Sequence, residues 1–112
     1  MEVKEQVVLA QGIRFSVCEN GTEVAHAYLY LGWNDLHPGK PFGFLEDVFV
    51  EPNHRGGGFF LGLMRQITGK AKESGCYKLI ATSRFERSRV HQLYLRIGFR
   101  EHGKEFRMDF ET

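Results

Sequence analysis

The chain has 112 residues, 42% of them hydrophobic and 26% charged, and its 15 basic and 14 acidic residues leave a net charge of +1. These values are typical of a globular protein with one modest core, so we predict a single domain over residues 1–112. They exclude a transmembrane helix, which needs about 20 apolar residues in a row, and a strongly basic surface for nucleic acid. We therefore expect neither a membrane nor a nucleic-acid partner.

The N-terminus and the cysteines indicate a cytoplasmic location. The opening stretch, MEVKEQVVLAQ, has acidic residues where a signal peptide is basic, and no long apolar segment follows it. Cys18 and Cys76 are too few for a disulfide framework or a cysteine-rich zinc site. The five histidines show no metal-ligand spacing. We predict a cytoplasmic protein that binds no metal.

A β-hairpin is predicted near the N-terminus. Residues 13–33, IRFSVCENGTEVAHAYLYLGW, contain two strand-like runs on either side of Asn20-Gly21, which is a strong hairpin-turn signal. One face of the second strand is apolar and carries Ala25, Ala27, Leu29, Leu31 and Trp33. The opposite face carries His26, Tyr28 and Tyr30.

A strand, a helix and another strand are predicted next. Residues 42–51, FGFLEDVFVE, are apolar on both faces, as in a central strand that is covered on both sides. From Gly58 to Ser74 the apolar residues recur with helical spacing, and Gly75 is placed to end this helix. These apolar residues are Phe60, Leu63, Met64, Ile67 and Ala71. Residues 76–83, CYKLIATS, are typical of a second buried strand.

The last third of the chain predicts a helix and then short strands. Residues 88–97, SRVHQLYLRI, have helical spacing, with Ser88 as the N-cap and Gly98 as the end. Residues 99–110 alternate in a strand-like pattern around a turn at Gly103. The order β-β-β-α-β-α-β, with a further strand at the end left open, predicts an α/β (α+β) fold with a mixed sheet. Residues 42–83 form one strand–helix–strand crossover in it.

Three consecutive glycines, Gly56–Gly58, stand between the central strand and the helix. The first turn of a helix has backbone N–H groups without intrahelical partners, so a phosphate could bind there, and glycine lets a bulky anion approach the backbone. The alternative is a flexible turn without a ligand. The sequence matches neither a Walker A loop, because Gly69-Lys70 precedes Ala71, nor the dinucleotide fingerprint, because Leu61 replaces its third glycine.

Three motifs together resemble the GNAT superfamily of acetyl-coenzyme A dependent N-acetyltransferases: EDVFVEPNHRGGG, GCYKLIATS and RSRVHQLYLRIGF. The resemblance covers residues 42–110 and implies a GNAT-like, mostly antiparallel sheet with acetyl-CoA as cosubstrate. In this family a loop of pattern Arg/Gln-x-x-Gly-x-Gly/Ala holds the coenzyme A pyrophosphate, and the run from Arg55 to Phe59 matches it. The cofactor-binding residues that the resemblance implies are Val48, Val50, Arg55, Gly56, Gly57, Gly58, Phe59, Phe60 and Arg87.

The chain departs from the family pattern at three places. Phe60 stands where the loop normally has Gly or Ala, and its ring either obstructs the cofactor or points into the core. Arg87 replaces an asparagine that many members place near the cofactor, and it either contacts coenzyme A or is a solvated surface residue. Only about a dozen residues precede the hairpin. The wall of the acceptor site is therefore short, absent or supplied by another subunit, which leaves a homodimer open.

Two catalytic residues are implied by the resemblance. Glu46 would accept the ammonium proton of the acceptor, directly or through water, although it could equally form an ion pair at a strand end. Asp47 points to the opposite face unless a bulge intervenes. Tyr94 would protonate the departing thiolate, although it also falls on an apolar helix face with Leu93 and could belong to the core.

The resulting hypothesis is an N-acetyltransferase that transfers acetyl directly to a primary amine in a ternary complex. The acceptor, a small-molecule amine or an amine of a protein or peptide, is not identified by the sequence. The face formed by His26, Tyr28 and Tyr30 could line the acceptor cleft, form a dimer contact or pack beneath a helix. The alternative function is a weak or inactive GNAT-fold module that binds acyl-CoA or a protein partner.

Overall fold

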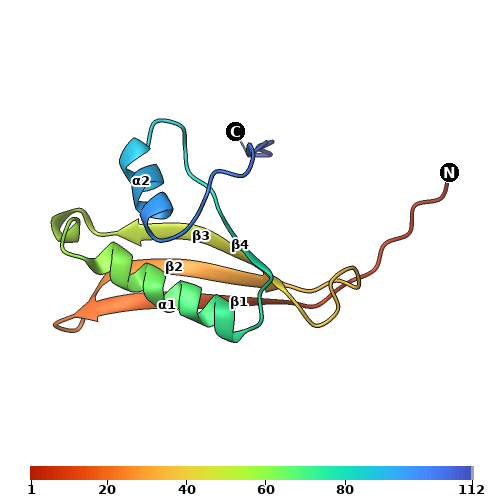
Figure 1. Ribbon diagram of the computed structural model, residues 1–112, viewed down its shortest axis with the longest axis horizontal. Helices are drawn as coiled ribbons and strands as arrows, with labels where there is room; N and C mark the ends of the chain where they lie inside the picture. The colour runs from red at the N-terminus through yellow and green to blue at the C-terminus, as the bar shows by residue number, and fades with distance from the viewer. Residues whose placement is uncertain (112) are drawn as a thin grey trace. The chain divides into compact units, whose positions relative to one another are not determined.

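The computed structural model describes residues 1–111, which divide into two compact units. The first unit, Met1–Ala81, contains the strands β1 (Ala10–Glu19), β2 (Thr22–Gly32), β3 (Phe42–Val50) and β4 (Lys78–Ala81). It also contains a short 3-10 helix, η1 (Pro52–His54), and the helix α1 (Phe59–Glu73). The second unit starts at Thr82 and contains the helix α2 (Ser88–Arg96) (Figure 1). The single-domain prediction stays a prediction.

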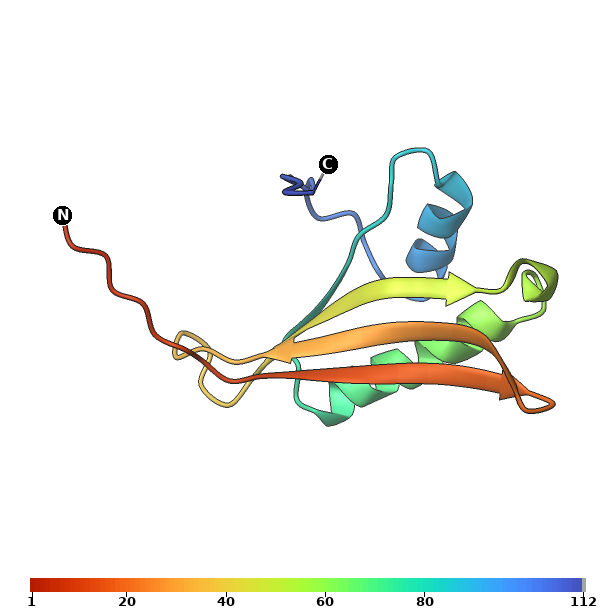
Figure 2. The same ribbon diagram turned by 180° about the vertical axis from the view of Figure 1, so that it is seen from behind.

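The four strands form one mixed sheet in the order β1-β2-β3-β4 (Figure 2). The first three strands pair antiparallel, whereas β3 and β4 pair parallel, with Phe42 opposite Lys78 at one end of the ladder. A parallel pair requires a crossover, and α1 provides it. The predicted fold class and the strand–helix–strand crossover are confirmed.

The hairpin between β1 and β2 has the predicted turn. Asn20 and Gly21 both have positive φ, 52° and 79°, and the flanking residues Glu19 and Thr22 are paired. Positive φ at both central positions matches the right-handed twist of the strands, and Asn and Gly are the residues that adopt it at least cost. The turn sets the first two pairs of the hairpin, and a one-residue shift between Val17 and Cys18 then pairs Val17 with Ala25 and sets the register of the rest of β2.

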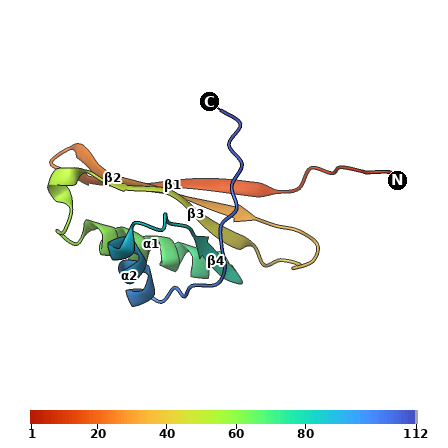
Figure 3. The same cartoon turned by 90° about the horizontal axis from the view of Figure 1, so that it is seen from above.

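The core of the first unit lies between the sheet and α1, which covers one face (Figure 3). The buried apolar residues are Val24, Ala25, Ala27, Leu29, Leu31, Leu45, Val50, Leu63, Met64, Ile67 and Ala71. The period-two face of β2 and the helical stripe of α1 meet there, as predicted. Gly75, with φ of 80°, ends α1 where expected, because Cys76 N–H donates to Ala71 O and Gly75 N–H to Lys72 O.

Two predictions for the last third of the chain were wrong. Arg87, and not Ser88, is the N-cap of α2, and no side chain caps this helix. Residues 99–111 form neither helix nor strand. Phe106 and Phe110 are each 90% exposed. Alternation by itself does not make a strand, because a strand forms only when its backbone groups pair with a neighbour.

No helix within residues 1–111 is long and apolar enough to cross a bilayer.

Candidate functional site

A β-bulge interrupts β3 beside the candidate base. Tyr28 of β2 is opposite Glu46 and His26 is opposite Phe49, so two residues of β3, Asp47 and Val48, share the single position opposite Ala27. Asp47 has φ of 50°, a left-handed conformation that aspartate adopts more readily than most residues. A bulge leaves backbone groups without cross-strand partners and redirects the strand. The bulge that the sequence left open is therefore present.

The second half of β3 has an open edge. The parallel ladder with β4 stops at the pair Leu45 and Ala81, whereas β3 continues beside β2 to Val50. The backbone groups of Glu46–Val50 that face away from β2 consequently have no partner in β4. An extended ligand can pair with such an edge as an additional strand would. The side chain of Val50 is buried, so its backbone is the part that this edge presents.

Glu46 is exposed on the sheet face that α1 leaves uncovered. Its neighbour Leu45 is buried and paired with Leu29 on the α1 side, so Glu46 and its partner Tyr28 lie on the other face. The Tyr28 hydroxyl accepts a hydrogen bond of 3.0 Å from Arg14 Nε. A solvent-accessible carboxylate on a rigid strand can receive a proton from a molecule that approaches this face.

The same face carries a row of rings. His26 stacks on Phe49 with centroids 5.5 Å apart, and Tyr28 stacks on Tyr30 at 6.2 Å. Because α1 covers the opposite face, these rings do not pack beneath α1, and the three interpretations of the His26, Tyr28 and Tyr30 face otherwise stay open.

A tight turn connects β3 to the glycines. Glu51 accepts hydrogen bonds from the Asn53 N–H at 2.9 Å and from His54 Nδ1 at 2.8 Å, both at the same carboxylate oxygen. Arg55 Nε donates to the Val50 carbonyl at 2.8 Å. The turn is thus closed by side chains before the glycine run begins.

The three glycines differ in backbone conformation. Gly56 and Gly58 have φ of 85° and 86°, which side chains rarely adopt, and a Cβ at either position would meet no atom within 4 Å. Gly57 does not have a positive φ, and its Cβ would make an ordinary contact of 3.5 Å with the Phe59 ring. The space above Gly56 and Gly58 is open to a bulky anion, and the turn glycines Gly21 and Gly75 have the same positive φ and open surroundings.

The glycine run leads directly into the N-terminus of α1. Gly58 is the N-cap without any capping side chain, and the Gly62 N–H makes a 3.0 Å bond to the Gly58 carbonyl. The N–H groups before Gly62 point out of the helix end, where the macrodipole favours negative charge. No acidic residue lies in this first turn. The junction has the geometry and the polarity to bind a phosphate.

Phe60 is the second residue of α1 and is half-buried. Phe59, the residue before it, packs its ring edge-on against His54 with centroids 5.6 Å apart. The predicted alternatives for Phe60, obstruction of the cofactor or packing into the core, both stay open.

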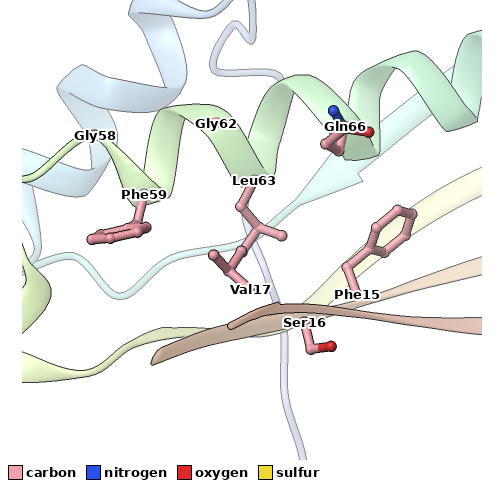
Figure 4. A pocket seen from close by; sticks show the side chains of 8 residues that line it. All are labelled: Phe15, Ser16, Val17, Gly58, Phe59, Gly62, Leu63 and Gln66. Atoms are coloured by element: carbon pink, nitrogen blue, oxygen red, sulfur yellow. The ribbon is translucent and has the colours of Figure 1, made fainter. Parts of the chain in front are cut away.

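A pocket of about 390 Å³ opens between β1 and the start of α1 (Figure 4). Its lining is mostly apolar and consists of Phe15, Ser16, Val17, Gly58, Phe59, Gly62, Leu63 and Gln66. Val17 and Leu63 point toward each other, and Gly62 leaves room beside them because a Cβ there would meet nothing. The sequence did not indicate this pocket, since Val17 is only one alternating position of a strand.

Tyr94 and Arg87 belong to the second unit. Tyr94 is half-buried on α2 and packs against Phe99 with centroids 5.2 Å apart. Burial raises the pKa of Tyr94 above its usual 10, and the positive charge of Arg87 partly opposes this shift. The hydroxyl consequently keeps its proton at neutral pH and can donate it. Arg87 is exposed, and its backbone N–H donates to the backbone carbonyl of Arg84 at 3.1 Å.

The structure places the predicted site residues in two groups. Glu46, Val48, Val50 and the segment Arg55–Phe60 are contiguous with β3 and α1 in the first unit, whereas Arg87 and Tyr94 are in the second. Within residues 1–111, no three His, Cys, Asp or Glu side chains gather in a way that could hold a metal ion.

Comparisons with known proteins give a consistent result. Residues 3–99 match the model of the acetyltransferase (GNAT) family. A glucosamine 6-phosphate N-acetyltransferase from Trypanosoma brucei brucei is 37% identical over 89 residues, which are 80% of this chain and 58% of the relative. An aminoglycoside N(6')-acetyltransferase type 1 from Stenotrophomonas maltophilia is 29% identical over 115 residues, 98% of this chain and 75% of the relative. The chain thus spans little more than half of the trypanosomal relative.

Solved structures agree with the sequence matches. An acetyltransferase from Trypanosoma brucei superposes with a TM-score of 0.81 at 29% identity, over 88% of this chain and 69% of that one. AAC(6')-Iy in complex with the bisubstrate analogue CoA-S-monomethyl-acetylneamine has a TM-score of 0.73 at 18% identity, over 90% and 70% of the two chains, and this likeness is one of fold. With the family model covering most of the sequence, the chain belongs to the acetyltransferase (GNAT) family.

Proposed function

We propose that the protein is an acetyl-CoA dependent N-acetyltransferase that transfers acetyl directly to a primary amine of a small molecule. One observation carries this proposal: an anion-binding helix start, an open strand edge and an exposed carboxylate follow one another along β3 and α1. Membership of the family supports it.

The pyrophosphate of acetyl-CoA would lie over Gly56–Gly58. The space above Gly56 and Gly58 is open, and the helix start supplies N–H donors and a favourable dipole. Because the net charge is only +1, this local site has to supply the attraction for the anion.

The pantetheine arm would run along the open edge of β3. Its amides can pair with backbone groups at Val48 and with the Val50 N–H, in the way that a peptide adds a strand to a sheet, whereas the Val50 carbonyl already accepts from Arg55 Nε. The bulge at Asp47 and Val48 supplies backbone groups that do not pair with β2. An N–H there would hold the acetyl carbonyl oxygen as negative charge develops on it.

Proton transfer would be divided between two side chains. Glu46 accepts the proton of the ammonium group, the neutral nitrogen attacks the acetyl carbon, and the C–S bond then breaks while the nitrogen releases its second proton to water. Tyr94 donates its proton to the thiolate, and its raised pKa means that it carries this proton at neutral pH. No covalent enzyme intermediate forms, so both substrates must be bound together.

The acceptor is proposed to be a small amine. The relatives are named for glucosamine 6-phosphate and for aminoglycosides, which are both amino sugars. The ring-lined face that carries Tyr28 and Glu46 is exposed in part and is a suitable place for such a molecule. A homodimer and a cytoplasmic location stay predictions.

A second function, a module that binds acyl-CoA or a protein partner without turnover, is favoured by one residue. Phe60 occupies the loop position where the family has a small residue, and its ring is large enough to hinder the cofactor. In that case Glu46 and Tyr94 would have no catalytic role.

Isothermal titration of the protein with acetyl-CoA tests the first step without knowledge of the acceptor. Micromolar binding is expected, followed by coenzyme A release when glucosamine 6-phosphate, an aminoglycoside or a lysine peptide is added in turn. Binding without release from any amine would favour the module. The absence of binding would refute the cofactor site, and with it the enzyme.

A further inference from the structure

Side chains of neighbouring residues make contacts on either side of the glycine loop, Gly56–Gly58. Three glycines in a row lose more conformational entropy on ordering than any other residues would. Here the segment before Gly56–Gly58 is held by hydrogen bonds of Glu51 and Arg55, and the Phe59 ring after the glycines packs against His54. These contacts therefore order the loop, which the glycines cannot do because they have no side chains.

Glu51 accepts two of the hydrogen bonds that hold this turn. Its Oε2 atom accepts both the Asn53 N–H and His54 Nδ1, at 2.9 Å and 2.8 Å. A carboxylate can only accept, so Nδ1 of His54 must carry the hydrogen. The imidazole can do this in its neutral and in its charged form.

The contacts continue from the turn to both neighbouring elements. The His54 ring meets the edge of the Phe59 ring, the first residue of α1, with centroids 5.6 Å apart. On the other side Arg55 Nε is bonded to Val50 O, and its guanidinium lies 5.7 Å from the centre of the Phe49 ring. Arg55, just before the glycine run, is thus tied to β3, and Phe59, just after it, is in contact with His54 of the turn.

We propose that Glu51 and His54 are positioning residues, which hold Gly56–Gly58 in the anion-binding shape before the coenzyme A pyrophosphate arrives. This inference rests on the proposed function. Neither side chain touches the ligand in this proposal. They act by removing the entropy cost of ordering the glycines during binding, which is how preorganisation increases affinity.

The charge state of Glu51 agrees with this role. The hydrogen bond from His54 lowers the pKa of Glu51, the Asn53 N–H and the charges of His54 and Arg55 act in the same direction, and burial opposes them. Since the folded-state pKa lies below the usual 4.5, the carboxylate is ionised throughout the neutral range. Its contribution to loop order is present above that value and is lost as the pH falls through the lowered pKa.

Titration calorimetry with coenzyme A on matched variants tests the proposal. Glu51→Ala removes the acceptor, and we expect the Kd to rise about tenfold, or ~1.4 kcal/mol. His54→Phe keeps the ring against Phe59 but has no donor, so the Kd should rise similarly. His54→Asn places an amide N–H near the position of Nδ1 and should restore most of the affinity.

Amide hydrogen exchange of residues 50–60 without ligand supplies a readout that does not depend on binding. Faster exchange in Glu51→Ala, at an almost unchanged Tm, is expected. A lower Tm with an unchanged Kd would show a purely structural role and overturn the proposal, as would wild-type exchange and wild-type Kd together. If the wild type itself does not bind coenzyme A, the proposed function fails, whereas the exchange result still decides whether Glu51 orders the loop.

Discussion

The two junctions that lead from a parallel strand into a helix are built differently. The junction after β3 has three glycines, two of them with φ near 85°, and a turn closed by Glu51. The junction after β4 has no glycine, and Arg87, the N-cap of α2, has φ of −93° and makes no side-chain cap. Both helices nevertheless end in the same way, at a glycine of positive φ.

The difference indicates which groups of each junction would bind a ligand. After β3 the donors are backbone N–H groups, which need glycine so that the ligand can come close. After β4 the polar groups are side chains, and they include Arg84, Arg87 and Arg89. A backbone cradle depends on conformation, whereas exposed arginines act through charge, so the two junctions should respond differently to mutation and to salt.

The largest effect is expected at Gly58. Gly58→Val puts a β-branched residue at φ of 86° and fills the open space above the loop, so acetyl-CoA affinity should fall by about 100-fold or more. Gly57→Ala is the matched control, because its φ is not positive and its Cβ would make only an ordinary contact. Calorimetry on both variants checks this. Equal losses at the two positions would show that left-handed geometry is not what the cradle needs.

A smaller effect on turnover is expected at Tyr94. Tyr94→Phe keeps the packing against Phe99 and removes the proton donor, so kcat should fall about 10- to 100-fold while the KM for acetyl-CoA changes little. Steady-state kinetics with an active amine measures both constants. An unchanged kcat would place Tyr94 in the core without a catalytic role.

Tyr94→Phe should also change how the free energy of unfolding depends on pH. Because burial raises the pKa of Tyr94 above 10, the folded state favours the neutral phenol. The stabilisation that results is fully present below the pKa of Tyr94 in the unfolded chain. It is lost as the pH rises through the pKa of Tyr94 in the folded protein. As the pH rises above about 10, the free energy of unfolding should therefore fall more in the wild type than in Tyr94→Phe. Urea unfolding at several pH values measures it, and parallel curves would contradict the shift.

Arg87 should contribute less than Gly58, because an exposed charge is screened by salt. We expect Arg87→Ala to raise the Kd for acetyl-CoA about three-fold in low salt, or ~0.6 kcal/mol, and less in high salt. Calorimetry at two salt concentrations measures the difference. A loss that is independent of salt would mean that Arg87 acts through the start of α2 and not through charge.

The smallest effect concerns stability alone. Gly69 lies exposed inside α1, its φ is not positive, and a Cβ there would meet nothing. Gly69→Ala should raise the free energy of unfolding by about 0.5–1 kcal/mol and leave acetyl-CoA affinity unchanged. Denaturant unfolding and calorimetry together test this. A loss of affinity would show that the helix itself, and not the loop, needs flexibility.

The sequence by itself determined the local elements and the family. Asn20-Gly21 predicted the hairpin, period-two alternation predicted the buried face of β2, and Gly75 predicted the end of α1, because each of these signals acts within a few residues of the chain. Three motifs in order along the chain, of which the loop around Gly56–Gly58 is one, together predicted the family, and the family model confirms it.

Only the tertiary structure decided the features that depend on pairing between distant residues. The bulge at Asp47 exists because β2 and β3 differ in register by one residue, and the ladder with β4 stops at Leu45 although β3 continues to Val50. The strand expected at residues 99–110 has the right alternation, yet no pairing forms it. Alternation shows which residues could share a face, whereas a neighbouring backbone has to supply the hydrogen bonds.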